Sequence, residues 1–331
     1  MIRVGIAGFG KIGQLRFQIL SSHEGFEVIS ILEKNKDAKI PQGISRASSF
    51  SELLEQQLDA VFICAFNDVL AEYAVEAIEK NIHVFCEKPP ARNVAELQKV
   101  AKAYSNKDIV LKYGFNHRYH YSVIEAKRMI DEGFFGKLIS ARGVYGKAGS
   151  IDYDKNWRNY KQISGGGILI DQGIHMLDLI RYLANEEFNV KYALVKTLFW
   201  KIEAEDNAFI LLEGKKGSIA SVHSSATQWK HKFLLELTFE NGYINLDGIL
   251  SGTRSYAPET IKYGLRELED ITWAMGKPQE HTVWFENDHS WQLEIEEFHS
   301  SIINGDSVKN GSIDDALKTL SLVQEVYQFN E

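Results

Sequence analysis

Residues 2–13, IRVGIAGFGKIG, decide the fold of this chain. The first seven form a short, mostly apolar run rich in β-branched side chains, which is typical of a buried strand. Gly8, Gly10 and Gly13 follow the pattern G-x-G-x-x-G, and the next residues, QLRFQIL, have helical spacing. A strand, this glycine pattern and a helix in direct succession predict a dinucleotide-binding turn.

Each glycine of this turn has a separate task. Gly8 permits the tight turn, Gly10 lets the backbone approach a pyrophosphate, and Gly13 lets the helix and the strand pack closely. The free N–H groups at the helix N-terminus would then face the phosphates. A second predicted strand, 27–33, ends at Glu33, about twenty residues after the last glycine, where such folds carry the carboxylate that binds the ribose. The sequence therefore predicts a nicotinamide dinucleotide as cofactor.

Glu33 also favours NAD over NADP. Its carboxylate can accept hydrogen bonds from both ribose hydroxyls and would repel a 2′-phosphate. Lys34 and Lys36 follow directly in the sequence, and either ammonium group could pair with that phosphate. NAD is the predicted cofactor, and NADP is the alternative.

Strands and helices alternate through the first third of the chain. Apolar strands are predicted at 59–65, 83–88 and 109–116, with amphipathic helices at 69–81 and 94–105. Strands that alternate with helices of this length predict the α/β class, with a doubly wound parallel sheet and helices on both faces. A doubly wound domain that binds a different ligand is the competing interpretation.

The composition is typical of a soluble globular protein, and the length allows two domains. Of the 331 residues, 44% are hydrophobic and 25% are charged, with a net charge of −8 and no Lys/Arg cluster. These values argue against binding to nucleic acid or to an anionic membrane, and no apolar run approaches the roughly 18 residues of a membrane span. Cys64 and Cys86 have no metal-type spacing, and the N-terminus carries no signal pattern. We therefore expect a cytoplasmic protein.

From about residue 192 the hydrophobic pattern changes to period two, which predicts antiparallel strands. Residues 213–217 and 240–242 read as hairpin turns, and Asn-Gly in the second is a strong signal. Long antiparallel strands with helices on one face leave the opposite face to be covered. Residues 253–267 show no clear period and are expected to form an irregular loop over the cleft.

Two amphipathic helices are predicted near the C-terminus, at 290–305 and 313–329. Gly305 ends the first helix, and Ser312 caps the second. The boundary between the two domains is expected near 117–121, because no linker rich in proline or glycine interrupts the chain there.

The stretch 164–178, SGGGILIDQGIHMLD, contains the strongest candidates for chemistry. If it is helical, Asp171 and His175 are i, i+4 neighbours on one face. Asp178 lies one turn further, with Arg181 or Tyr182 as its natural partner. The three glycines before it would let the chain approach a ligand closely and leave room for a substrate.

These residues could form a metal site, an acid/base pair or an ordinary helix start. A metal site needs at least three ligands with an organised second layer of partners, and no spacing supplies a convincing third ligand. We therefore predict no metal. The His117-x-x-His120 pair has metal-type spacing, but we expect only His117 or Arg118 to face the cleft. Histidine is the side chain best suited to move protons near neutral pH, which favours the acid/base interpretation.

Glu87-Lys88-Pro89, at the end of a predicted strand, resembles the E-K-P signature of the Gfo/Idh/MocA family, the glucose-fructose oxidoreductase and inositol dehydrogenase group. Four further stretches agree in order and approximate position, so the resemblance spans nearly the whole chain: 8–13, Asn116-His117-Arg118, 165–167 and 171–175. One turn departs from the family pattern Thr-Pro-Asn-x-x-His. Asn67 is kept there, whereas Phe66 replaces the proline and Leu70 the histidine.

The resemblance implies a Rossmann domain over residues 1–118 and an α/β domain over 119–331 with a large, open, mostly antiparallel sheet. It implies NAD(P)-dependent oxidation or reduction of a hydroxyl carbon in a sugar, polyol or sugar nucleotide. It also implies a second subunit against the open sheet, so we expect a homodimer or a homotetramer. Residues 154–167 somewhat resemble the corresponding loop of sugar-nucleotide 3-dehydrogenases in the family.

Within this framework His175 is the expected acid/base, Asp171 its partner or an anchor for a substrate hydroxyl, and Lys88 the group that stabilises charge on the reacting oxygen. Arg158 or Lys147 could meet a carboxylate or a diphosphate. The expected cofactor-binding residues are Gly8, Phe9, Gly10, Lys11, Ile12, Gly13, Glu33, Asn67, Glu87 and Lys88. The expected substrate-binding residues are Asn116, Arg118, Tyr145, Trp157, Arg158, Asp171 and His175.

Two alternatives to a conventional dehydrogenase are open at this point. A dinucleotide-binding regulator would keep the fold but not the chemistry, and such proteins typically lose the lysine or the histidine. Retention of Lys88, Asp171 and His175 together favours the enzyme. The second alternative is an enzyme of the family that holds NAD tightly and recycles it.

Overall fold

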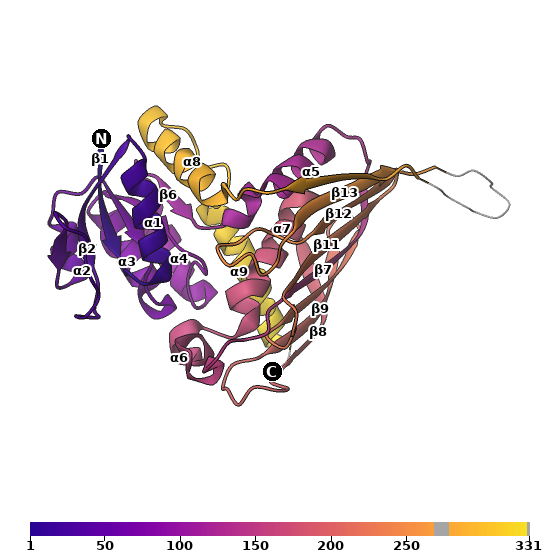
Figure 1. The fold of residues 1–331 in the computed structure, drawn as a ribbon, viewed down its shortest axis with the longest axis horizontal. Helices are drawn as coiled ribbons and strands as arrows, with labels where there is room; N and C mark the ends of the chain where they lie inside the picture. The colour runs from indigo at the N-terminus through magenta and orange to yellow at the C-terminus, as the bar shows by residue number, and fades with distance from the viewer. Residues whose placement is uncertain (268–277, 330–331) are drawn as a thin grey trace. The chain divides into compact units, whose positions relative to one another are not determined.

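The computed structural model describes residues 1–267 and 278–329, and it falls into two compact units (Figure 1). The first unit comprises Met1–Asn116, Gln162–Gly165 and Trp291–Ser321. The second comprises His117–Lys161, Gly166–Ser290 and Leu322–Glu331. Each unit has its own sheet.

In the described residues, the first unit forms a six-stranded parallel sheet with the order β3-β2-β1-β4-β5-β6. This is the strand order of a Rossmann fold, which confirms the predicted class. The strands are β1 (Ile2–Ala7), β2 (Phe26–Leu32), β3 (Ser45–Ala47), β4 (Ala60–Ile63), β5 (His83–Cys86) and β6 (Leu111–Tyr113). The helices between them are α1 (Lys11–Ser22), α2 (Phe50–Leu54), α3 (Asn67–Glu79) and α4 (Val94–Tyr104). Only β3 and α2 were not predicted, because they are too short for a hydrophobic period to show.

Helix α8 (Ser290–Asn304) supplies part of the first unit's core, although it lies far away in the sequence. Phe298 is fully buried, and its ring lies 5.4 Å from that of Phe62 and 5.6 Å from that of Phe85. The backbone N–H of Tyr113 in β6 donates to the Gly311 carbonyl at 2.7 Å. Residues 291–321 therefore belong to the first unit, which differs from the continuous 119–331 domain that we expected.

The second unit forms an eight-stranded sheet with the order β14-β13-β12-β11-β7-β10-β9-β8 among the described residues. Only the β7–β10 pair is parallel there, so the prediction of a mostly antiparallel sheet is confirmed. The strands are β7 (Leu138–Gly146), β8 (Phe188–Lys196), β9 (Asn207–Gly214), β10 (Ile219–Ser225), β11 (Lys232–Phe239), β12 (Gly242–Asp247), β13 (Glu259–Leu265) and β14 (His281–Phe285). Both predicted hairpins are present, as β9–β10 and β11–β12. The expectation of an irregular 253–267 is wrong from Glu259 onward, because that part pairs with β12 as β13.

Helices α5 (Tyr121–Asp131) and α7 (Ile174–Ala184) cover one face of this sheet (Figure 1). Close packing requires a glycine beneath α7, because a Cβ at Gly143 would lie 2.6 Å from the Met176 side chain. Helix α9 (Ile313–Gln328) ends the described chain, and Ser312 caps it as predicted by accepting from the Asp315 N–H at 3.1 Å. None of the helices in residues 1–267 and 278–329 combines the length and the apolar character that a membrane crossing requires.

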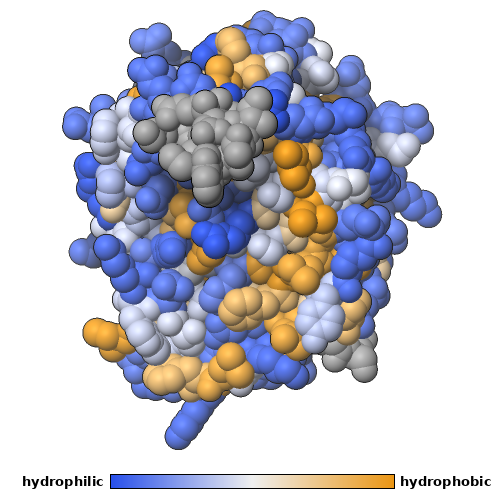
Figure 2. Space-filling model, turned by 90° about the vertical axis from the view of Figure 1, so that its right-hand side faces the viewer, coloured by the Kyte–Doolittle hydropathy of each residue, from blue (hydrophilic) through white to orange (hydrophobic). Residues whose placement is uncertain are grey.

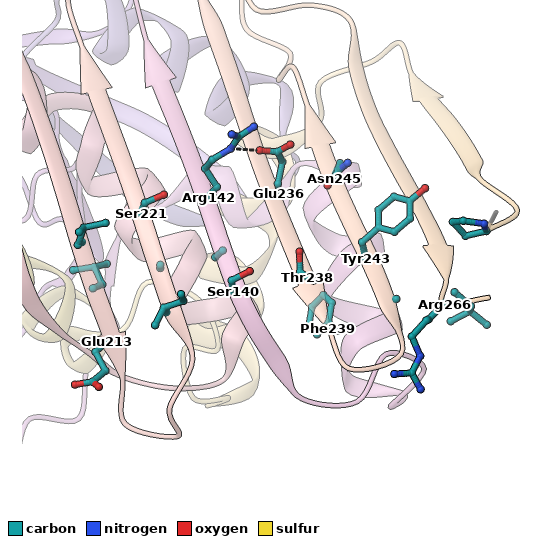
Figure 3. Close-up of a pocket in the computed structure, with 18 of the residues that line it drawn as sticks. Ser140, Arg142, Glu213, Ser221, Glu236, Thr238, Phe239, Tyr243, Asn245 and Arg266 are labelled. Carbon is teal, nitrogen blue, oxygen red and sulfur yellow. Dashed lines mark hydrogen bonds and ion pairs between the residues drawn. The ribbon is translucent and has the colours of Figure 1, made fainter. Parts of the chain in front are cut away.

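The opposite face of the eight-stranded sheet is exposed and partly apolar (Figure 2). Along β9 the side chains alternate, so that Phe209 and Leu211 are about half exposed while Ile210 and Leu212 are buried. A hollow of about 1130 Å³ lies on this face, and Figure 3 shows the strand side chains that line it, among them Arg142, Glu236 and Tyr243. Other large apolar side chains exposed on these strands are Tyr192, Leu194, Ile219, Leu265, Val283 and Trp284.

Replacement of Phe298 by alanine should destabilise the first unit by about 3–5 kcal/mol, because it empties an aromatic site in the core. The matched control is Ile303→Ala on the same helix, where the side chain is 61% exposed and the expected cost is about 0.5 kcal/mol or less. Urea unfolding followed by circular dichroism measures both. Equal effects of the two substitutions would contradict the assignment of α8 to this core.

Candidate functional site

The glycine turn after β1 is shaped as the sequence predicts. Gly8 has φ +92°, and a Cβ there would lie 2.5 Å from the Cys64 carbonyl oxygen. A Cβ at Gly13 would lie 2.0 Å from the Gly8 carbonyl oxygen, so internal packing requires both glycines. A Cβ at Gly10 would meet no atom within 4 Å. Open space beside Gly10 is what a dinucleotide pyrophosphate needs in order to approach the backbone.

Glu33 lies beside this turn, as expected. Its carboxylate accepts the backbone N–H of Phe9 at 2.7 Å and that of Asn35 at 2.8 Å. The two bonds fix the carboxylate at the end of β2, where the ribose carboxylate of Rossmann folds lies. Arg46, which we did not predict as a site residue, donates to carbonyl oxygens of residues 35, 36 and 38 in the same loop.

Arg16 forms a buried ion-pair cluster behind the Glu-Lys-Pro segment. Its Nε lies 2.7 Å from Glu87, and its Nη2 lies 2.6 Å from Glu294 of α8. Burial raises the pKa of Glu294 to about 7, although the Arg16 charge opposes this shift. The side chain of Glu87 is therefore paired with Arg16 inside the protein. We had predicted Glu87 as a cofactor-binding residue and had not predicted this ion pair. Lys88 follows directly, half-buried and two residues beyond β5.

Asn67, a predicted cofactor residue, is buried at the start of α3. Its Nδ2 donates to the Ser164 carbonyl at 2.8 Å, so the amide links this turn to the segment 162–165 of the same unit. The sequence gives no sign of this contact, because the two residues lie far apart in the chain.

The stretch from Leu169 to Gly173 is a π-helical turn, and the α-helix begins only at Ile174. The condition of one regular helix, on which the i, i+4 spacing of Asp171 and His175 was based, is therefore not met at this point. Glu205, which is buried, accepts the N–H groups of Gly167 and Leu169 at 2.8 and 3.0 Å and thereby holds the start of the turn. π-Helical turns of this kind occur frequently at functional sites.

Asp171 in this turn forms two ion pairs. Its Oδ2 lies 2.9 Å from Lys147 Nζ, and its Oδ1 lies 3.2 Å from Arg158 Nε. Arg158 also lies over the Trp157 ring, 4.3 Å from the centroid. The structure thus brings together three predicted site residues, Asp171, Trp157 and Arg158, together with Lys147.

His175, on the first turn of α7, stacks on His117. The ring centroids lie 3.7 Å apart at an angle of 16°. His117 Nε2 lies 3.0 Å from the hydroxyl of Tyr145 on β7, and all three side chains are buried. Tyr145, a predicted substrate residue, is therefore in the surroundings of His175, with ring centroids 6.5 Å apart.

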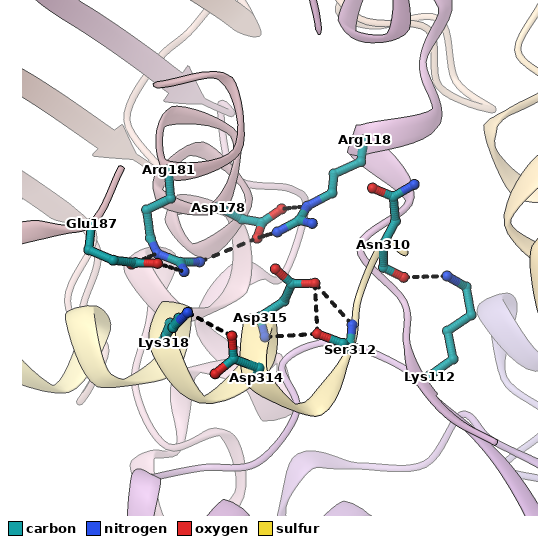
Figure 4. Close-up of polar contacts among 10 residues, drawn as sticks. All are labelled: Lys112, Arg118, Asp178, Arg181, Glu187, Asn310, Ser312, Asp314, Asp315 and Lys318. Carbon is teal, nitrogen blue, oxygen red and sulfur yellow. Dashed lines mark hydrogen bonds and ion pairs between the residues drawn. The ribbon is translucent and has the colours of Figure 1, made fainter. Parts of the chain in front are cut away.

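Arg118 does not have the substrate-binding geometry that we expected. Its guanidinium is buried and forms a bidentate pair with Asp178 at 2.8 and 2.7 Å (Figure 4). The predicted partner Arg181 lies 3.9 Å from Asp178 and binds Glu187 more closely. His120 pairs with Glu259 at 2.8 Å, so the two histidines of the His-x-x-His pair have different partners. In the described residues no group of three or more His, Cys, Asp or Glu side chains could hold a metal ion.

Protein atoms pack closely against the run of three glycines, 165–167. Added Cβ atoms would lie 2.6 Å from the Arg92 carbonyl oxygen at Gly165 and 2.1 Å from the Tyr327 hydroxyl at Gly166. At Gly167 the Glu205 carbonyl oxygen would lie 2.1 Å away. Packing against protein atoms therefore accounts for all three glycines, and the expectation of room for a ligand here stays a prediction.

Two side chains near Asp171 were not predicted. Tyr256 accepts a hydrogen bond from Gln172 Nε2 at 3.1 Å, and its ring lies 5.4 Å from that of Tyr145. His231 lies 4.9 Å from Tyr256, ring to ring. Neither residue belongs to a recognisable motif, so the sequence contains no signal that could have found them.

Comparison with known proteins agrees with both units. Residues 2–115 match the oxidoreductase family with an NAD-binding Rossmann fold, and residues 123–245 match the GFO/IDH/MocA C-terminal domain. A myo-inositol 2-dehydrogenase of Thermotoga maritima is 28% identical over 81% of each chain. A levoglucosan dehydrogenase of Pseudarthrobacter phenanthrenivorans is 37% identical over 43% of this chain and 37% of its own.

A solved structure of levoglucosan dehydrogenase, in complex with NADH and levoglucosan, has the same fold. Its TM-score is 0.84 at 22% identity, and the match covers 99% of this chain and 96% of that one. The two domain matches together span most of the chain. Their order agrees with the order of three sequence motifs: the glycine turn, the Glu-Lys-Pro segment and the Asp171–His175 stretch. This chain belongs to the Gfo/Idh/MocA family of oxidoreductases.

Proposed function

We propose that this protein is an NAD-dependent dehydrogenase that acts on a hydroxyl carbon of a sugar, a polyol or a sugar nucleotide. The observation that carries the proposal is the open space at Gly10 beside a fixed Glu33 carboxylate, in a domain of the NAD-binding family. Curated relatives named as inositol and levoglucosan dehydrogenases support the class of substrate.

The cofactor would be held by the glycine turn, whose N–H groups bind the pyrophosphate, and by Glu33, which binds the ribose hydroxyls. Nicotinamide supplies the hydride acceptor when it is bound. Glu33 favours NAD because a carboxylate repels a 2′-phosphate. Arg46, Lys34 and Lys36 are the cations that a 2′-phosphate would have to use instead.

We assign the transfer of the hydroxyl proton to His175, whose ring is held by its stack on His117. The ammonium group of Lys88 would donate to the reacting oxygen and stabilise the negative charge that develops on it. Asp171, which is held between Lys147 and Arg158, is suited to accept hydrogen bonds from substrate hydroxyls. Its role as partner of His175 remains part of this proposal.

The exposed face of the eight-stranded sheet supports a homodimer or a homotetramer. About half-exposed Phe209, Leu211 and Tyr192 lie on this face together with Trp284, which is 63% exposed. An antiparallel sheet that carries helices on one face only can bury its other face against a second copy. We place this assembly in the cytoplasm, where Cys64 and Cys86 would stay reduced.

His175→Ala should lower kcat by about 10²–10⁴-fold and leave the Kd for NADH within about twofold, because this group acts on the substrate oxygen and not on the cofactor. Lys88→Met should lower kcat by a similar factor. Turnover on a panel of polyols, sugars and sugar nucleotides and calorimetric binding of NADH measure the two effects. Lys155→Met, which removes an exposed cation, is the control. Equal losses of turnover and NADH affinity would contradict these roles.

The same measurements distinguish the two alternative functions. Tight NADH binding by the unmodified protein without turnover of any panel member would point to a regulator. Nicotinamide absorbance in the purified protein would indicate recycled NAD.

Gly10→Ala should raise the Kd for NADH by about tenfold or more, because the added methyl group occupies the space proposed for the pyrophosphate. The fold should be unaffected, because no protein atom lies within 4 Å of that methyl group. Gly252→Ala is the matched control, since its Cβ also meets open space. Calorimetry measures affinity, and thermal unfolding measures stability. Unchanged NADH affinity in Gly10→Ala would exclude this path for the pyrophosphate.

Leu211→Asp should dissociate the assembly into chains of 37.6 kDa, because it places a carboxylate in the apolar exposed face. Size-exclusion chromatography with light scattering measures the mass. Ile303→Asp, at an exposed site on α8, should leave the mass unchanged. A monomeric unmodified protein would show that this face is not a subunit interface.

A further inference from the structure

Around Asp171 two cations share one carboxylate. Lys147 and Arg158 both bind Asp171, and their side chains are 17% and 38% exposed. Among the described residues, neither Glu205 nor Asp206 forms an ion pair with Lys147 or Arg158. Glu205 is bound to backbone N–H groups and to the Tyr327 hydroxyl, and Asp206 accepts the N–H groups of residues 198, 199 and 200. The three charged groups of the Lys147–Asp171–Arg158 cluster therefore sum to one positive charge in a partly buried place.

A cavity of about 350 Å³ is lined by Gln228 and Tyr256, which contact residues of this cluster or their chain neighbours. The Gln228 N–H donates to the Lys147 carbonyl at 3.0 Å, and Tyr256 on the other wall bonds to Gln172, the neighbour of Asp171. Three consecutive basic residues, 230–232, line the cavity, and its lining contains one acid, Asp247. The volume lies in the range of small-molecule sites.

His231 gives this cavity a polar atom, Nδ1, that lacks a hydrogen-bond partner among the described residues. Its Nδ1 is buried and makes no hydrogen bond with any described residue. Burial, and then the charge of Lys147, lower the pKa of His231. A neutral imidazole keeps one N–H group, which can donate a hydrogen bond to an anionic ligand. This bond does not require a further buried positive charge.

A row of aromatic rings leads from Tyr256 in this cavity to the proposed acid/base. The Tyr145 ring lies 5.4 Å from that of Tyr256 and 6.5 Å from that of His175, centroid to centroid. One ligand that extends along these rings could place its reacting hydroxyl at His175 and its other end at Lys147.

We propose that this cavity and the Lys147–Asp171–Arg158 cluster form an anion subsite, which binds the carboxylate or phosphoryl group of a sugar substrate. The inference rests on the proposed function, because the His175 end of the ligand is taken to react. A neutral sugar would leave the net charge of the cluster uncompensated. A carboxylate or phosphoryl group gains charge-assisted hydrogen bonds from an ammonium and a guanidinium group.

The test is calorimetric titration of the protein–NADH complex with glucose, glucuronate and glucose 6-phosphate at low salt. We expect at least one anionic probe to bind about tenfold or more tightly than glucose, since a charge-assisted bond of this kind contributes a factor of that order. The anionic probe that binds with the lower Kd shows whether the subsite prefers a carboxylate or a phosphoryl group. Lys147→Met and Arg158→Met should reduce this preference about fivefold or more, while Lys147→Arg should keep it.

Lys155→Met is the matched control, because it removes a cation that is 73% exposed and pairs with Asp152 instead of Asp171. Thermal unfolding and NADH affinity show that each variant is folded. The inference is overturned if glucose binds as tightly as the anionic probes or more tightly. It is also overturned if the preference for an anionic probe survives in both methionine variants, or if none of the probes binds to the NADH complex. Failure of NADH itself to bind would overturn the proposed function together with it.

Discussion

A buried guanidinium is the constraint on which the cofactor-binding unit depends. Arg16 is fully buried, with carboxylates of Glu87 and Glu294 at 2.7 and 2.6 Å and the rings of Phe85 and Trp291 on its sides. A charge without solvent must be paired, because an unpaired buried ion is strongly destabilising. The cluster therefore fixes the helix after the glycine turn, the residue before Lys88 and helix α8 with respect to one another.

The sequence predicts the first unit well because its signals are local. The glycine pattern, the apolar strands and the helical spacing occur within short windows, and the six-stranded order confirms the class that they indicate. Arg16 and Glu294 lie 278 positions apart, and Arg118 and Asp178 lie 60 apart, so no local pattern could pair them. The same holds for the glycine run 165–167, where the atoms that exclude a side chain come from distant segments.

The second unit shows how surroundings change the meaning of a motif. Helical spacing placed Asp171 one turn from His175, but the π-helical turn and the two cations give Asp171 a different set of partners. Two cations hold Asp171, whereas His175 stacks on the His117 ring. The two side chains therefore have different surroundings, although they lie four residues apart.

The discontinuous first unit has a consequence for how the chain is made. Phe298 and Ile295 complete its core and Glu294 neutralises Arg16, yet all three residues follow the whole eight-stranded sheet in sequence. The ribosome synthesises a chain from its N-terminus at about 5–20 residues per second. The nascent Rossmann segment therefore keeps an apolar patch uncovered, and Arg16 lacks the Glu294 carboxylate, until α8 has emerged. Folding of a segment that is synthesised early thus waits for one that is synthesised late.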